Sequence, residues 1–415
     1  MRDGNEVFKG REKGFSMSRE KVIFIAEKFV EYGFYGLIFF LPISKALIES
    51  FAGFVFLGFI IKKIATRDFT SFKVDAKIFW FLLALFVFNA LSLINSGPFL
   101  AKGFRALFFK WGEYFFLFMI AVDHFRDRKL IKRFFYVFIF SGMLLGLSVL
   151  SQKLLGVEFL RGRSLVGHAV TGSFENPNSL GAYLVYCLPA FIALVYWKWK
   201  NKAMAAVVFF TCIILSVSIL LTFSRGGWLG FLIGLLGMIV LFEKKKFPTL
   251  IFVGFLSTVC LFSPFIKRVM FSFSSTGDSQ RYVIWQGAFE MIKDKPILGQ
   301  GLGTYMSYFL EYIPNLGGIY YAHNCYLQIW AESGFFTLIA FLALAGFIVY
   351  RGIRISLRNK KDDFGILLAG LTAGIFGFLV ASFFDTQLYS LQLSVLFWVM
   401  LGVTVSVQRI LLREV

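Results

Sequence analysis

Apolar segments long enough to cross a lipid bilayer recur along almost the whole of this 415-residue chain. A stretch of about 18 or more apolar residues spans the hydrocarbon core as an α-helix. A helix satisfies its own backbone hydrogen bonds, as hydrocarbon requires. The residues are 58% hydrophobic and 16% charged, and the mean hydropathy is +0.73. This composition predicts a polytopic membrane protein with no room for a sizeable soluble domain.

The apolar segments predict an all-α membrane protein with about twelve transmembrane helices. The expected spans are 22–42, 46–64, 77–95, 107–124, 131–154, 179–197, 203–223, 226–243, 248–265, 333–352, 363–384 and 389–409. The predicted regions are a basic N-terminus at 1–21, spans 1 to 9 within 22–265, a large loop at 266–332, spans 10 to 12 within 333–409 and a tail at 410–415.

Lysine and arginine concentrate in alternate loops, and this pattern predicts the orientation, because basic loops are retained in the cytoplasm. The clusters are the N-terminus, Lys62/Lys63/Arg67/Lys73, Arg126/Arg128/Lys129/Lys132/Arg133, Lys198/Lys200/Lys202, Lys244/Lys245/Lys246, Arg351/Arg354/Arg358/Lys360/Lys361 and Arg409/Arg413. Both termini are therefore predicted to be cytoplasmic, and loop 266–332 to face the periplasm from a bacterial inner membrane. Topology and attraction to anionic membrane lipids explain the net charge of +19, so no nucleic-acid partner is expected.

The basic N-terminus and the apolar run at 22–42 have the outline of a signal peptide. The run is longer than the usual core of about 7–15 residues, and segment 46–64 is again apolar. The first helix is therefore predicted to be a retained anchor.

No metal centre and no cofactor are predicted. The cysteines, Cys187, Cys212, Cys260 and Cys325, lack metal-binding spacing and are expected to be small apolar side chains. No histidine or carboxylate stands four residues after His323, so a His-x-x-x-His site is unsupported.

Two outer segments before the large loop carry polar residues that the topology rule does not explain. In loop 155–178, Arg161 and Arg163 stand where positive charge is normally depleted. The sequence Asn176-Pro177-Asn178-Ser179 in the same loop predicts a turn followed by a helix cap.

Arg225 lies in the tight break Thr222–Trp228, at the membrane interface, where an arginine usually has an anionic partner. Gly226 and Gly227 allow close approach of a ligand and expose N–H groups at a helix start, which favours phosphate. The alternative is that Arg225 extends to lipid headgroups.

Loop 266–332 is the third candidate, since long loops are uncommon unless they are functional. A helix with an aromatic face, capped by Asp278 or Ser279, is expected there, with Arg281 near its start. The aromatic face would hold Tyr282, Trp285, Phe289 and Met291.

Two further features of the loop are a glycine run at 299–303 and His323, which stands where the chain re-enters the membrane. The glycine run lacks the strand and the acidic residue of a dinucleotide site, so a turn is predicted. A lone histidine is more often structural than functional. Arginines and a histidine on one face favour transfer to a hydroxyl with a diphosphate leaving group, because guanidinium binds phosphate bidentately and imidazole accepts a proton near neutral pH.

Five motifs, in this order, resemble those of the lipopolysaccharide O-antigen ligase family. They are Gly172-Ser173-Phe174-Glu175-Asn176-Pro177-Asn178, Ser224-Arg225-Gly226-Gly227-Trp228, Arg281 with Trp285, Pro296-Ile297-Leu298-Gly299-x-Gly301, and His323-Asn324 with Glu332 and Gly334. The similarity of motif order and topology runs from about residue 20 to 410. The resemblance implies a metal-independent inverting glycosyltransferase that moves O-antigen polysaccharide from undecaprenyl diphosphate to a lipid A core sugar at the periplasmic face.

The resemblance also implies roles for particular residues. Arg225 and Arg281 match arginines expected to hold the diphosphate, and His323 matches the expected base. The residues predicted to bind substrate are Arg161, Arg163, Asn176, Ser224, Trp285, Asn324 and Asp385.

Two other functions remain open at this point. An O-antigen polymerase, or another oligosaccharyltransferase, would use the same lipid-linked donor with a different acceptor. A transporter of an anionic solute would require ionisable residues within the bundle, for which Glu27, Glu31 and Glu113 are the candidates.

Overall fold

The computed structural model describes residues 18–68, 74–199, 201–242, 246–262, 264–267, 275–314 and 321–413. The described residues are ~81% helical. Within the described residues, β-type pairing is confined to two isolated bridges, Val157 with Ser164 and Val166 with Ala169. The predicted all-α class is confirmed.

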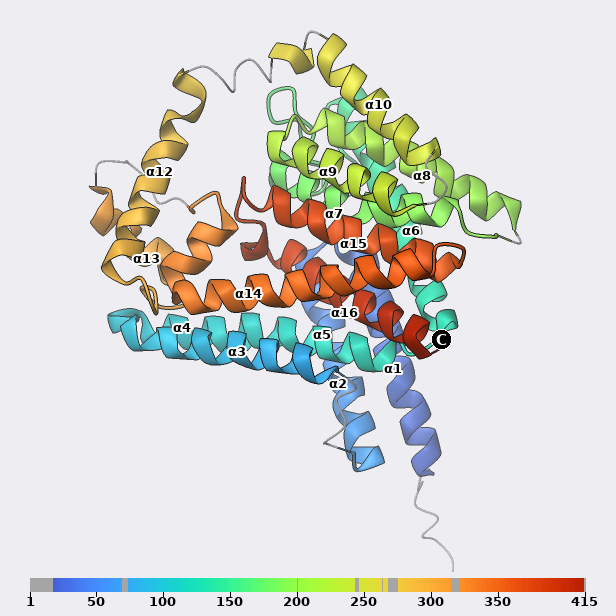
Figure 1. The fold of residues 1–415 in the computed structure, drawn as a ribbon, viewed down its shortest axis with the longest axis horizontal. Coiled ribbons are helices and arrows are strands. Elements are labelled where there is room, and N and C mark those ends of the chain that lie inside the picture. The colour runs from blue at the N-terminus through green and yellow to red at the C-terminus, as the bar shows by residue number, and fades with distance from the viewer. Residues whose placement is uncertain are drawn as a thin grey trace, which may run out of the picture.

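The helices run in chain order as shown in Figure 1. They are α1 Arg19–Phe40, α2 Lys45–Thr66, α3 Ala76–Ser92, α4 Leu100–Ala106, the π-helix η3 Leu107–Gly112, α5 Glu113–His124, α6 Arg128–Leu155, α7 Pro177–Val195, α8 Lys202–Leu221, α9 Arg225–Leu241, α10 Lys246–Leu261, α12 Ser275–Asp294, α13 Tyr305–Tyr312, α14 Cys325–Arg358, α15 Asp363–Ala381 and α16 Leu391–Arg413. Short 3-10 turns occupy Leu93–Asn95, Gly97–Phe99 and Gln387–Tyr389.

Every predicted span is occupied by helix. Among the described residues, seven helices are long and apolar enough to cross a membrane, namely α3, α6, α7, α8, α14, α15 and α16. Helices α9 and α10 are apolar but shorter. The multi-pass membrane character is therefore confirmed, while the number of spans and the sides on which the loops lie stay predictions.

The centre of the bundle is formed by α7, α15 and α16. In the most apolar stretch of each helix, 83%, 78% and 89% of the residues are buried, against 33% for α8. Glycines let these helices approach closely, as in small-xxx-small packing between membrane helices. A Cβ at Gly370 would lie 2.5 Å from the Pro189 carbonyl oxygen of α7. A Cβ at either Gly230 of α9 or Gly377 of α15 would lie 2.6 Å from the carbonyl oxygen of the other residue.

Helix α14 begins at Cys325, before the predicted start of the tenth span at 333, and that start stays a prediction. A break at Gly334 (φ 82°, ψ 177°) separates a first helical segment from the long apolar one that hydropathy detects. The glycine run docks on this break. Gln300 N–H donates to the Ala331 carbonyl at 2.8 Å and Gly301 N–H to the Glu332 carbonyl at 2.8 Å. Positive φ at Gly299, Gly301 and Gly303 confirms the predicted turn.

Helix α12 exists but begins at Ser275, so the expected cap at Asp278 or Ser279 is wrong. Ser, Thr and Asp residues crowd this stretch with similar capping preferences, so the sequence does not rank them.

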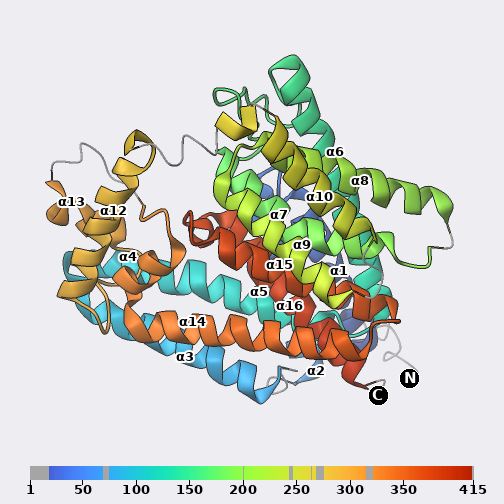
Figure 2. The same ribbon diagram turned by 45° about the horizontal axis from the view of Figure 1, so that its top comes forward.

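The face of α12 that packs agrees with the predicted one only in part, because Met291 and Trp285 of the predicted face pack there. Ile284, Ala288 and Met291 are buried, whereas the side chains of Tyr282 and Phe289 are 65% and 45% exposed. The buried face packs with Tyr305 and Phe309 of α13. Both views show α12 and α13 at the same end of the bundle as α4 (Figure 2).

The close contact between α9 and α15 gives a stability prediction. We expect Gly377→Val to lower the free energy of unfolding by about 1–3 kcal/mol, because the added side chain meets a backbone carbonyl that cannot rotate away. Gly254→Val is the matched control, since a Cβ at Gly254 in α10 meets nothing within 4 Å. Thermal unfolding in detergent, followed by circular dichroism, measures both. Equal losses in the two variants would contradict the packing argument.

Candidate functional site

Two adjoining cavities bring together residues from distant parts of the chain. The larger has a volume of about 1090 Å³ and is lined by His323, Asn176 and Asp385 among others. The smaller, of about 40 Å³, is lined by Arg225, Arg281 and Asp385 among others. Asn178, Asp385 and Gln387 line both cavities, so the two share one wall.

The smaller cavity lies at the N-terminus of α9. Ser224 caps this helix, and its Oγ accepts a hydrogen bond from Gly227 N–H at 3.2 Å. Arg225 is the first helical residue, and α12 contributes Arg281 to the same cavity. Phe223, just before the cap, has the left-handed φ of 53°, a conformation that clusters at functional sites. Two guanidinium groups beside a helix N-terminus form a site suited to a phosphate-like anion.

The larger cavity contains an ion pair between His323 and Asp385, with Nδ1 and Oδ1 2.9 Å apart. Burial raises the pKa of Asp385. Hydrogen bonds from His323, Thr386 N–H and Asn178 lower it, and together they outweigh burial, so its pKa lies below the usual range. The carboxylate is therefore ionised near neutral pH and can only accept hydrogen bonds. Nδ1 must then carry the proton, which leaves the lone pair of a neutral His323 ring on Nε2.

The position of His323 is fixed by its neighbours along the chain. Its own φ is 47°, a left-handed value that is uncommon for a histidine in an ordinary turn. The next residue, Asn324, caps α14 by accepting hydrogen bonds from Tyr326 N–H at 2.9 Å and Leu327 N–H at 3.1 Å. Cys325 N–H donates to the Ser382 carbonyl at 2.9 Å. These bonds tie the start of α14 to the end of α15, where Asp385 follows.

Of the other residues expected to bind substrate, Asn176 lines the larger cavity, whereas Asn324 and Trp285 are not among the described residues of its lining. Asn176 also caps α7, with its Oδ1 2.8 Å from Ser179 N–H, which confirms the predicted turn and cap. Asn324 is buried in its capping role, and Trp285 Nε1 donates to the Ala322 carbonyl at 2.9 Å. The described residues that line the two cavities include neither Asn324 nor Trp285. Their contact with substrate stays a prediction.

A buried carboxylate shapes the loop that carries Arg161 and Arg163. Glu158 accepts hydrogen bonds from the backbone N–H groups of both arginines, at 2.8 and 3.1 Å. Both guanidinium groups lie outside the described linings of the cavities, and their substrate contact also stays a prediction.

The positive charges of Arg161 and Arg163 nevertheless act electrostatically on a residue of the larger cavity. This residue is Glu175 at the cavity edge, whose pKa is lowered first by the hydrogen bond from Lys45 and further by Arg163 and Arg161.

The sequence analysis missed several charged residues that line the larger cavity. Lys102 and Arg105 of α4 and Lys110 of η3 belong to this set. They lie in or beside the predicted outer loop between spans 3 and 4, where the charge rule that singled out Arg161 applies equally. That rule, used consistently, could have found them.

The acidic residues considered for transport are engaged in ion pairs or line the larger cavity. Glu27 pairs with Arg126 at 2.6 Å, and Glu31 pairs with Lys28 at 2.6 Å and Arg133 at 3.1 Å. These contacts join the ends of neighbouring helices and give both residues a structural role. Glu113 lines the larger cavity.

Comparison with known protein families adds an independent observation. Residues 210–342 match the family described as O-antigen ligase. No curated protein matches the chain. The matched stretch contains Arg225, Arg281 and His323, which the structure places around the two adjoining cavities.

The lowered pKa of Asp385 predicts a pH-dependent contribution to stability. A carboxylate with a depressed folded-state pKa stabilises the protein above its ordinary value of about 3.9, and the contribution is lost as the pH falls through the folded-state value. We therefore expect Asp385→Asn to lower the unfolding temperature near neutral pH, and the gap to the wild type to narrow under acid conditions.

Glu290→Gln is the control for this measurement, because Glu290 forms only an exposed ion pair with Lys293. Such pairs contribute at most about 1 kcal/mol, so little change is expected at any pH. Parallel wild-type and Asp385→Asn curves across the pH range would contradict the prediction.

Proposed function

We propose, since the chain belongs to the O-antigen ligase family, that it transfers O-antigen polysaccharide from undecaprenyl diphosphate to a lipid A core sugar. Family membership by itself indicates glycan transfer of the O-antigen ligase or polymerase type. The observation that carries the proposal is the shared wall of the two cavities. It sets an arginine-lined anion site directly beside a histidine held by a carboxylate.

The diphosphate of the donor would bind in the smaller cavity. Arg225 and Arg281 supply planar groups that hold phosphate oxygens bidentately, and the α9 N-terminus adds a favourable dipole. As the bond to the sugar breaks, negative charge grows on the leaving oxygen. Fixed cations aimed at that position stabilise the transition state more than the bound donor.

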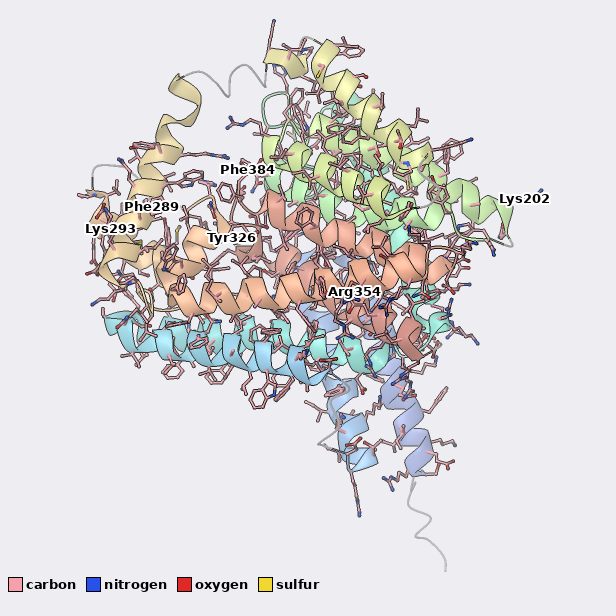
Figure 3. The ribbon with its side chains drawn as sticks, in the orientation of Figure 1. Lys202, Phe289, Lys293, Tyr326, Arg354 and Phe384 are labelled. Carbon is pink, nitrogen blue, oxygen red and sulfur yellow. The ribbon has the colours of Figure 1, made fainter. Side chains whose placement is uncertain are left out.

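An apolar groove beside this cavity supports a lipid-linked donor. The groove has a volume of about 500 Å³, and α14 and α15 supply most of its lining. Phe384 lines both the groove and the smaller cavity, so the two adjoin. Figure 3 labels Tyr326 and Phe384 in the region between α12 and the ends of α9 and α15. A polyprenyl chain in the groove would therefore have its diphosphate at Arg225 and Arg281.

His323 would act on the acceptor. The lone pair on Nε2 takes the proton of an acceptor hydroxyl, whose oxygen attacks the anomeric carbon while the bond to diphosphate breaks. Configuration inverts because a single displacement occurs from the face opposite the leaving group. The proton remains on the imidazole, and ionised Asp385 stabilises the resulting imidazolium, as the acidic member of a catalytic triad does.

The direct test uses the purified full-length protein in detergent with undecaprenyl-diphosphate-linked O-antigen and lipid A core in the presence of EDTA. We expect a product in which O-antigen is attached to lipid A core, resolved by gel electrophoresis. A strict requirement for a divalent cation would contradict the proposed chemistry.

A second set of reactions in the same assay separates ligation from polymerisation. It contains lipid-linked repeat units and no lipid A core. Longer lipid-linked chains in these reactions, without ligation in the first set, would identify a polymerase.

His323→Ala tests the role of the base. General-base catalysis contributes about 10²–10⁴-fold, so we expect kcat to fall by that factor with little change in the KM for the donor. His168→Ala is the matched control, because His168 is an exposed histidine of the earlier loop. Initial rates measure the effect, and unfolding temperatures show whether both variants are folded. Full activity of a folded His323→Ala variant would rule out the mechanism.

A further inference from the structure

The larger cavity has a basic wall that the proposed chemistry does not use. Lys102 and Arg105 project from α4 and Lys110 from η3, and all three line this cavity together with His323. Their side chains are exposed. Among the described residues, Arg105 and Lys110 form no salt bridge with a carboxylate, and Lys102 Nζ donates to the neutral Ser307 Oγ at 2.9 Å. Two cations beside His323 thus have no salt-bridge partner in the described part of the chain.

Several acidic residues of the same cavity already have partners. Asp385 pairs with His323, and Glu175 pairs with Lys45 at 2.5 Å. Glu332 interacts electrostatically with Lys110, but its oxygens accept hydrogen bonds from Tyr305 N–H at 3.1 Å and from the Tyr389 hydroxyl at 2.9 Å.

Two further carboxylates of the cavity, Glu49 and Glu113, interact repulsively with each other. Negative charge on this pair disfavours an anion in their part of the cavity. The wall of α4 and η3 is therefore the more favourable place for an anion.

The turn that precedes this wall is held against the segment that docks on α14. The Tyr308 hydroxyl donates to the Ser96 carbonyl at 3.0 Å, and Leu302 N–H donates to Ser92 Oγ at 3.2 Å. Asn95 Nδ2 donates to the Gly299 carbonyl at 2.8 Å. The π-helix itself is a rare conformation that occurs mostly at functional sites, and here it places Lys110 on the cavity wall. An anchored backbone limits the reorganisation that the segment carrying these cations needs to bind a ligand.

We propose that the larger cavity binds the acceptor glycan and that Arg105 and Lys110 bind a phosphate or carboxylate group carried by that glycan. This inference rests on the proposed function, because His323 on the same cavity wall would activate the acceptor hydroxyl. An anionic group held by Arg105 and Lys110 fixes the glycan so that one hydroxyl faces Nε2. The enzyme then selects acceptors by charge as well as by sugar.

The test compares two acceptors that carry the same hydroxyl, a phosphorylated core oligosaccharide and the same oligosaccharide after phosphatase treatment. The protein is the full chain in nanodiscs of phosphatidylcholine, which carries no net charge. We expect the wild type to show a KM about tenfold lower for the phosphorylated acceptor. Arg105→Gln combined with Lys110→Gln should raise that KM about tenfold and remove the preference, with kcat and the donor KM unchanged.

Two variants control for general effects of charge and folding. Lys153→Gln removes an exposed cation at the end of α6 that is absent from the described lining of the cavity, and should leave the preference intact. Arg105→Lys in the Lys110→Gln background should restore part of the affinity. An equal change in KM for both acceptors in the double variant would overturn the proposal. So would a loss of preference in the wild type on addition of phosphatidylglycerol, because the cations would then bind lipid headgroups.

A binding measurement separates this proposal from the proposed function. Isothermal titration of the phosphorylated acceptor without donor requires no transfer reaction. If no acceptor yields product but binding weakens about tenfold in the double variant, the anion site stands and the transfer function fails. If transfer proceeds and the wild type binds both acceptors equally, the anion site fails and the transfer function stands.

Discussion

The hydrogen bond between His323 and Asp385 is the interaction on which the site depends. The two residues lie on segments far apart in the sequence, the start of α14 and the connection between α15 and α16. Asp385 also lines both cavities, so this one carboxylate fixes the histidine and forms part of the wall beside the arginines. A shift of α14 relative to α15 would therefore disturb the base and the anion site together. The buried contact of Cys325 Sγ with the Asp385 carbonyl, at 3.4 Å, adds to the same joint.

The break in α14 makes this joint possible. A continuous helix through Gly334 would leave no carbonyl groups for the glycine run to bind. With the break, the Ala331 and Glu332 carbonyls accept hydrogen bonds from the run, and Glu332 binds Tyr305 N–H and the Tyr389 hydroxyl. A single unusual backbone conformation thus joins the long loop, the apolar part of α14 and the connection between α15 and α16. Only glycine fits there, because a Cβ would collide with the Ile297 carbonyl.

The sequence predicted those parts of the molecule that follow from local chemistry. Hydropathy located helices in all the expected spans, and the cap at Asn176 and the turn at 299–303 follow from residue type. It failed where tertiary contacts decide. The helical segment before Gly334 accepts hydrogen bonds from the docked glycine run, and the packed face of α12 includes only Trp285 and Met291 of the aromatic stripe. The family resemblance pointed to Asp385, but the sequence alone did not show that it bonds to His323, since Asp385 lies outside the five motifs and 62 residues after His323.

The basic residues of the predicted outer face fall into three sets that differ in their contacts. Arg225 and Arg281 stand at a helix N-terminus in the smaller cavity, which suits a diphosphate held throughout the reaction. Arg105 and Lys110 stand on a firm wall of the larger cavity, beside the histidine, which suits a group on the incoming acceptor. Arg161 and Arg163 lie on a loop built around Glu158 and act on the cavity edge through their field. All three sets oppose the charge rule for translocated loops in the same way. Their surroundings in the structure, and not their sequence positions, distinguish the three sets.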